Sequence, residues 1–92
     1  MIRASAYPDG VLHLEFTIEP FVEGRPGPHV TQAIAAVEAL GPAVEIGPFG
    51  SGCDVAADRL PDVLAAIGRE AFAHGATHVS LHVSTPDPET RS

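Results

Sequence analysis

The sequence predicts an α+β domain in which two helices cover one face of a four-stranded antiparallel sheet. Two stretches, residues 11–19 and 77–84, alternate between apolar and polar side chains, which is typical of strands with one buried face. Two others, residues 28–40 and 60–74, carry apolar side chains three and four positions apart, which is typical of helices that bury one side. A pair of short strands between the helices completes the predicted sheet.

The first strand is predicted for residues 11–19, between the turn signal Pro8-Asp9-Gly10 and Pro20. Proline has no N–H group to donate to a neighbouring strand, so Pro20 should end this one. The inward-facing residues are Leu12, Leu14, Phe16 and Ile18, and the outward-facing residues are Val11, His13, Glu15, Thr17 and Glu19.

The first helix is predicted for residues 28–40. Pro28 suits a first helical turn, and Gly41 followed by Pro42 is a stop signal because glycine accepts the left-handed conformation that ends many helices. The apolar side of this helix consists of Val30, Ala33, Ile34, Val37 and Leu40.

Two short strands follow, predicted as a hairpin at residues 43–49 and 53–56. We expect Val44 and Ile46 to point inward, and Gly50-Ser51-Gly52 to form a turn or bulge between the strands. The glycines of this connection would also allow a ligand or another backbone segment to approach closely.

The second helix, residues 60–74, is predicted with Asp58 as its cap and Pro61 in its first turn, and Gly75 should end it. Its apolar side consists of Leu60, Val63, Leu64, Ile67 and Ala71. In the last strand Val79, Leu81 and Val83 should face the core, and His78, Ser80, His82 and Ser84 should face outward.

The order strand, helix, strand, strand, helix, strand predicts a ferredoxin-like βαββαβ sandwich. Right-handed crossovers are expected to place the first and last strands side by side near the centre of the sheet. We interpret residues 1–92 as one domain, with an ordered core at about 10–85 and a flexible tail at 86–92.

Composition limits the partners of this domain. Its net charge of −7 and pI near 4.9 disfavour nucleic acids and anionic membranes and favour cationic or neutral ligands. The single cysteine, Cys53, excludes a disulfide framework, a four-cysteine zinc site and an iron–sulfur cluster within one chain. A lone thiol, the lack of a bilayer-length apolar run and a start without a signal-peptide core together predict a cytoplasmic protein with no membrane partner.

The polar face of the predicted sheet is the candidate functional surface. It combines the outward-facing residues of the first and last strands, which would lie ~4.8 Å apart as neighbours. Three interpretations stay open: a solvated sheet face, a dimer interface across sheets, or a ligand surface. A metal site formed by His13, Glu15 and His82 would need cross-strand geometry that the spacing alone does not predict, and Cys53 has no local motif for a nucleophile. We therefore predict no metal ion and no catalytic residue.

Four short motifs resemble a known family. They are Glu15-Phe16-Thr17-Ile18-Glu19-Pro20, Gly27-Pro28-His29-Val30, Gly47-Pro48-Phe49-Gly50-Ser51 and Gly75-Ala76-Thr77-His78-Val79-Ser80. They resemble landmarks of the thiamine-binding YkoF-like and MTH1187-like proteins, the DUF77 family, over about residues 12–84. Where that family has a threonine and then a glutamate, this chain has Ser51 and Asp54, which are shorter but keep the hydroxyl and the charge.

The resemblance implies a ferredoxin-like domain that assembles through its sheets, as a homodimer or homotetramer, and binds thiamine or its hydroxymethylpyrimidine part without catalysis. Carboxylates or an aromatic face suit a thiazolium cation, and hydroxyl or carboxylate groups suit an aminopyrimidine. Residues of these types near one end of the inferred sheet are Glu15, Thr17, Phe49, Ser51 and Asp54. Two alternatives stay open: a ferredoxin-like dimeric enzyme that uses the open sheet face, and a structural or regulatory assembly module without a small ligand.

Overall fold

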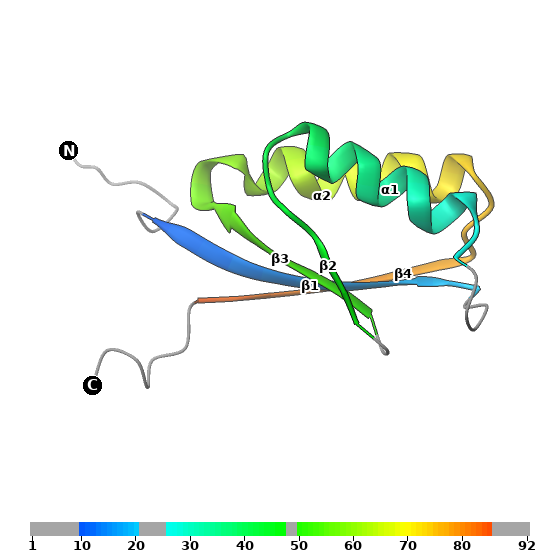
Figure 1. Ribbon diagram of the computed structural model, residues 1–92, viewed down its shortest axis with the longest axis horizontal. Coiled ribbons are helices and arrows are strands. Elements are labelled where there is room, and N and C mark those ends of the chain that lie inside the picture. The colour runs from blue at the N-terminus through cyan, green and yellow to red at the C-terminus, as the bar shows by residue number, and fades with distance from the viewer. Residues whose placement is uncertain (1–9, 21–25, 48–49, 86–92) are drawn as a thin grey trace.

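The computed structural model describes residues 10–20, 26–47 and 50–85, and it confirms the predicted α+β class. Figure 1 shows two layers, with α1 and α2 side by side over one face of a four-stranded sheet. The elements are, in chain order, β1 (Val11–Glu19), α1 (Pro28–Ala39), β2 (Glu45–Gly47), β3 (Gly50–Ala56), a 3-10 turn (Ala57–Arg59), α2 (Leu60–Ala73) and β4 (His78–Ser84). This is the predicted ferredoxin-like βαββαβ order.

The strand order in the sheet is β2-β3-β1-β4, and every neighbouring pair is antiparallel. The prediction that β1 and β4 lie side by side is confirmed, but β4 forms an edge and does not lie near the centre. The β2–β3 hairpin already occupies one side of β1. The strand that follows α2 therefore pairs with the remaining side of β1 and ends the sheet there.

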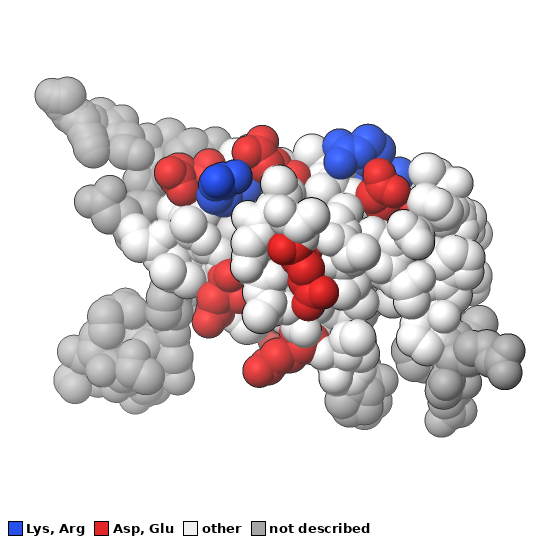
Figure 2. Space-filling view, turned by 45° about the horizontal axis from the view of Figure 1, so that its top comes forward, with Lys and Arg blue, Asp and Glu red and all other residues white. Residues whose placement is uncertain are grey.

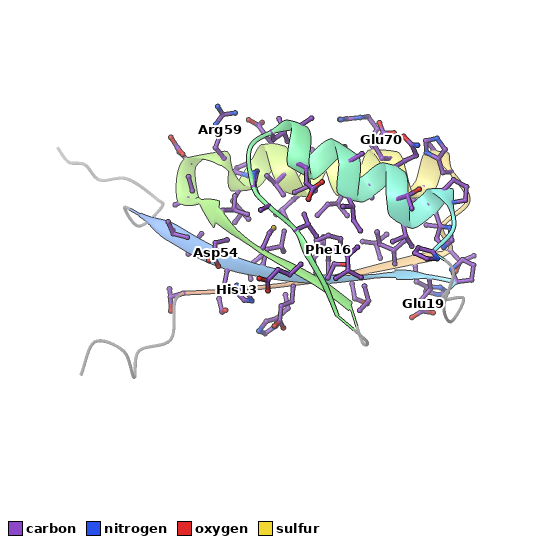
Figure 3. The ribbon with its side chains drawn as sticks, in the orientation of Figure 1. His13, Phe16, Glu19, Asp54, Arg59 and Glu70 are labelled. Carbon is purple, nitrogen blue, oxygen red and sulfur yellow. The ribbon has the colours of Figure 1, made fainter. Side chains whose placement is uncertain are left out.

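The hydrophobic core lies between the sheet and the helices. The predicted alternation of β1 is confirmed, since Leu14 and Phe16 are 0% and 2% exposed. Figure 3 shows the Phe16 side chain in the layer between the strands and the helices. The other members of the core are Ile18, Ala33, Ile34, Val37, Cys53, Val55, Val63, Ile67 and Ala71. Removing this apolar surface from water is the main stabilising contribution to the fold.

Both helices end close to their predicted limits. α1 stops at Ala39 and α2 at Ala73, and Gly41 and Gly75 follow them with φ angles of +123° and +105°. These left-handed φ values confirm the two stop signals. The capping prediction for α2 is wrong, because Asp58 lies in the 3-10 turn and no side chain caps the helix. No helix in the described ranges combines the length and the apolarity needed to cross a bilayer.

The middle of the chain differs most from the prediction. β3 begins at Gly50, so Gly50-Ser51-Gly52 belongs to a strand and is neither a turn nor a bulge. β2 is three residues long, and Ile46, predicted to point inward, is 66% exposed. Figure 1 shows this hairpin reaching away from the helices, which explains the exposure of Ile46. Val44, which precedes β2, packs against the core as predicted.

β4 is buried less than predicted. Leu81 and Val83 pair with Phe16 and Leu14 of β1, so they share the face of the sheet that the helices cover. They are nevertheless 42% and 38% exposed. An edge strand has a neighbour on one side only, and this is why the alternation of β4 predicts the correct face but overestimates the burial.

Hydrogen bonds hold the end of β1 to α1 and β4 at one corner of the fold. The His29 Nε2–H donates to the carbonyl oxygen of Pro20 at 2.6 Å, and His29 is 7% exposed. The Thr77 backbone N–H donates to the carbonyl oxygen of Glu19 at 2.7 Å. Main-chain carbonyls that leave a strand need new partners, and these two bonds supply them.

Candidate functional site

The open face of the sheet, opposite the helices, collects polar side chains from all four strands. Directly opposed residues in an antiparallel sheet share a face, so the strand register defines this surface. Residues that oppose one another across the strands form rows on this surface. The middle row, from β2 across β3 and β1 to β4, consists of Glu45, Gly52, Glu15 and His82. The row on one side of it consists of Asp54, His13 and Ser84, and the row on the other side consists of Thr17 and Ser80. Strands that are distant in the sequence thus contribute to one continuous polar patch.

Gly52 leaves a gap in the centre of the middle row. A Cβ atom at this position would lie 3.7 Å from His13 Cε1 and 3.8 Å from Glu15 Cγ, which is ordinary van der Waals contact. Glu45 and Glu15 stand on either side of the gap, roughly 10 Å apart by two strand spacings. An open hollow of about 840 Å³ lies here, and its lining includes these residues and Asp54. A flat ligand could therefore reach the backbone of β3 between two carboxylates.

His13 links two carboxylates on this face. Its Nδ1 lies 2.9 Å from Asp54 Oδ1, and its Nε2 lies 3.4 Å from Glu15 Oε2. The hydrogen bond with Asp54 is the main reason why the pKa of His13 is raised above 6.5, and Glu15 adds to the effect, while partial burial opposes it. The protonated imidazole can donate through both ring nitrogens, so it suits this bridging position. Figure 3 shows His13 and Asp54 together at the sheet, on the side away from the helices.

Charge is distributed unequally between the two layers. The described part of the open face carries Glu15, Glu45 and Asp54, together with Glu19 near its far end. The two arginines among the described residues, Arg59 and Arg69, belong to the helical layer. Figure 2 shows them as blue patches over the helices, and Figure 3 labels Arg59 there. The open face is therefore electronegative, and it should attract cations.

The structure brings three of the five predicted site residues to one surface. Glu15, Thr17 and Asp54 all lie on the open face. Ser51 pairs with Phe16 and therefore faces the helices, although it also borders the hollow. A predicted turn assigns Ser51 to neither face of the sheet. In the continuous strand adjacent residues point to opposite faces, and this directs Ser51 toward the helices. The fifth residue, Phe49, lies outside the described residues.

Three of the residues around the hollow are not among the site residues that the sequence predicts. The sequence predicts Gly52 in a turn or bulge whose glycines let a ligand approach closely, and it assigns no role to Glu45. His13 is predicted on the polar face and named there as a possible metal ligand, but its link between two carboxylates is not predicted. A signal for Glu45 was present, since the inward prediction for its neighbours Val44 and Ile46 implies that Glu45 faces outward. No sequence pattern predicts that Gly52 lies between Glu45 and Glu15, because the strand register creates this arrangement.

Cys53 lies on the opposite face of the sheet from the hollow's carboxylates. It is 4% exposed and pairs with Leu14 in the core. Burial raises the pKa of its thiol, which keeps the sulfur protonated and unreactive. Within residues 10–20, 26–47 and 50–85, no three His, Cys, Asp or Glu side chains are grouped so that they could hold a metal ion.

Comparison with known proteins identifies similar folds. No family model and no curated protein matches the sequence. Among solved structures, a domain of unknown function, DUF77, from Bacillus cereus is 21% identical with a TM-score of 0.60, over 83% of this chain and 74% of that one. A Thermotoga maritima protein proposed to act in thiamine biosynthesis or salvage is 18% identical with a TM-score of 0.60, over 88% of this chain and 95% of that one.

A third similar structure is a Streptococcus pneumoniae protein. It is 19% identical with a TM-score of 0.59, over 82% of this chain and 83% of that one. At these identities the similarity establishes a common fold. The resemblance predicted from the short sequence motifs is thereby confirmed at the level of the fold, because the DUF77 domain is among the matching structures.

Proposed function

We propose that this chain is a non-enzymatic binding protein for thiamine or its hydroxymethylpyrimidine part, with the ligand in the hollow over Gly52. The observation that carries this proposal is the row Glu45-Gly52-Glu15-His82, in which two carboxylates flank a gap that contains no side chain. A planar ring can approach a glycine backbone closely, and a cationic ring is attracted by the carboxylates beside it.

The polar groups around the gap suit both halves of such a ligand. Glu15 and Glu45 offer negative charge to a thiazolium cation. The hydroxyl of Thr17, in the adjacent row, can donate to a ring nitrogen of an aminopyrimidine, and the Asp54 carboxylate can accept from its amino group. The net charge of −7 adds a long-range attraction for a cation.

Two further observations support binding without chemistry on the ligand. Both ring nitrogens of His13 lie close to carboxylates, which favours the protonated imidazole, and in that form the ring has no lone pair to act as a base. The Cys53 thiol is buried on the other face of the sheet. The similar fold of the Thermotoga maritima protein, which is proposed to act in thiamine biosynthesis or salvage, supports the choice of ligand.

A thermal-shift titration with thiamine, hydroxymethylpyrimidine, thiamine phosphates and zinc tests the proposal, followed by calorimetry on each compound that raises the melting temperature. A ligand that binds only the native state stabilises it by ~2.7 kcal/mol at a hundredfold excess over Kd. We expect thiamine or hydroxymethylpyrimidine to raise the melting temperature. If neither does so, the proposal is wrong.

Two variants should locate the ligand. Glu15→Gln and Asp54→Asn each remove one charge beside the gap, and each should weaken thiamine binding about tenfold, the loss of one charge-assisted contact. The matched control is Glu70→Gln, which removes the same charge from α2, where Figure 3 shows Glu70 on the helical layer. Equal weakening by all three would indicate a net-charge effect and no local site.

The same samples test the absence of catalysis. After incubation with the protein, the bound compound is released and examined by mass spectrometry. Recovery of unchanged ligand is the expected result. Conversion of the compound by the wild-type protein would instead favour an enzyme that uses the open face.

A further inference from the structure

The His13 ring stands beside the gap over Gly52 and borders the hollow. A Cβ atom at Gly52 would lie 3.7 Å from His13 Cε1, so the ring is within van der Waals reach of the gap. In an imidazole, Cε1 lies between Nδ1 and Nε2, and both nitrogens carry a proton when the ring is charged. A ligand in the gap therefore meets the part of His13 on which the positive charge is placed.

The carboxylates that would attract a cationic ligand already hold a cation when His13 is protonated. Asp54 Oδ1 lies 2.9 Å from its Nδ1, and Glu15 Oε2 lies 3.4 Å from its Nε2. The hydrogen bond with Asp54 is the main reason why the pKa of His13 is raised above 6.5, while partial burial opposes the shift and Glu15 adds to it. The ring therefore changes its charge close to neutral pH.

The charged and titratable groups that face His13 come from all four strands. Asp54 opposes it on β3, and Glu15 is its neighbour on the same face of β1. His82 opposes Glu15 on β4, and Glu45 of β2 stands on the far side of the gap. Among the described residues, Asp54 and Glu15 are the carboxylates in contact with its ring nitrogens. Their charge is therefore shared between His13 and any cation that enters the hollow.

We propose that His13 determines which ligands the hollow accepts, and this rests on the function proposed above: the ring proton of His13 is an internal cation that a cationic ligand displaces. A thiazolium ring in the gap and an imidazolium beside it would both approach Glu15 and repel each other. A bound cation therefore lowers the pKa of His13, and thiamine binds best to the protein whose His13 is neutral.

The exchange conserves charge and leaves the ligand unchanged. When thiamine enters the site, the Nε2–H bond of His13 breaks, its electron pair stays on the nitrogen, and the proton passes to the buffer. Nε2 has the longer contact, 3.4 Å to Glu15, whereas the Nδ1–H can keep its hydrogen bond with Asp54 at 2.9 Å. One positive charge enters as another leaves. No bond of thiamine is formed or broken, so the exchange is compatible with binding without catalysis.

Calorimetric titration with thiamine between pH 6 and pH 8 tests the proposal. The affinity of the wild type should rise by about fivefold to tenfold across this range, because His13 loses its proton. Titrations at pH 7 in phosphate and in Tris, which differ in their heats of ionisation, count the protons that enter the buffer. We expect the wild type to release part of one proton for each thiamine bound.

Replacing His13 should strengthen binding at low pH. His13→Gln removes the internal cation, so at pH 6 it should bind thiamine more tightly than the wild type, with an affinity that stays constant to pH 8 and no proton release. A residue with only a structural role would weaken binding when replaced. The matched control is His78→Gln, because His78 lies on the same face beside Glu19, at 3.9 Å, and does not line the hollow. This variant should keep the pH dependence of the wild type.

Proton NMR of the wild type covers the case in which His13→Gln fails to fold. The chemical shift of the His13 Cε1 proton, assigned in isotope-labelled protein, reports the charge of the ring, and saturating thiamine should lower its pKa. An unchanged pKa, an affinity independent of pH, or proton release that persists in His13→Gln would overturn this proposal while thiamine binding stands. Failure of thiamine to bind at every pH would overturn the proposed function and this proposal together.

Discussion

The two faces of β1 share one backbone but differ in their surroundings. Leu14 is fully buried in the core, whereas the side chain of the next residue, Glu15, is 64% exposed beside the hollow. Burial of apolar groups stabilises a fold strongly, while exposed charges are screened by water and contribute little. One strand therefore supplies stability on one side and the polar groups of the proposed binding site on the other, and substitutions on the two faces should have separable effects.

The largest expected effect comes from the buried face. Leu14→Ala should lower the free energy of unfolding by about 3 to 5 kcal/mol, because it removes buried methyl groups and leaves a cavity. A domain of this size has a total stability of about 5 to 15 kcal/mol. Glu15→Ala, one position away on the open face, should change stability by no more than about 0.5 kcal/mol. Urea unfolding followed by circular dichroism measures both, and equal losses would contradict the contrast between the faces.

Gly52→Ala should change stability and binding in opposite directions. The added methyl group meets His13 and Glu15 at ordinary contact distances, so the strand should tolerate it. Replacing a glycine where alanine fits stabilises a protein by about 0.4 to 1 kcal/mol, because it restricts the unfolded chain. The same methyl group fills the gap between the carboxylates, so thiamine binding measured by calorimetry should weaken.

Gly68→Ala is the matched control for this substitution. A Cβ atom at Gly68 in α2 would meet nothing within 4 Å, so the variant should gain about 1 kcal/mol of stability from helix propensity. Its affinity for the ligand should equal that of the wild type. If Gly52→Ala also keeps full affinity, then the ligand does not occupy the space over Gly52.

The smallest expected effect is the pH dependence caused by His13. Its pKa is raised in the folded chain, chiefly by the hydrogen bond with Asp54, so the protonated form stabilises the fold. This contribution is fully present below the unfolded value of about 6.5 and is lost as the pH rises through the higher folded value. Because the pair is exposed, the contribution should be no more than about 1 kcal/mol.

Denaturant unfolding of the wild type and His13→Gln across this pH range measures the effect. The wild type should be the more stable protein at pH 6, and the difference should shrink as the pH rises above the folded pKa. The same comparison made in an Asp54→Asn background should show a smaller dependence on pH, because the main partner of His13 is lost. If the stability difference between the wild type and His13→Gln grew with rising pH, the predicted direction of the pH dependence would be wrong.

The sequence predicted local features well where the signal was a repeated pattern. The alternation in β1 predicted both of its faces, and the helical spacing predicted α1 and α2 to within one residue at their C-terminal ends. Gly41 and Gly75 predicted the left-handed positions that follow the helices. These features depend on the period of the backbone and on the conformational freedom of glycine, and both are present in the local sequence.

The predictions failed where the answer depended on neighbours in space. Gly50-Ser51-Gly52 resembles a turn in isolation, but pairing with β1 makes it part of a strand and turns Ser51 toward the helices. Leu81 and Ile46 have the spacing of core residues, and their edge positions leave them exposed. The spacing of apolar residues within a segment cannot show which strands will lie beside that segment in the sheet.

The amino-acid sequence by itself determined the fold class, the order of the elements and the apolar face of each helix. It also determined the acidic character that favours a cationic ligand. The tertiary structure decided that Glu45, Gly52, Glu15 and His82 form one row, and that β4 lies at an edge. The physical reason is that periodicity is set by each residue's own backbone geometry, whereas register and strand order are set by pairing between segments that are distant in the chain.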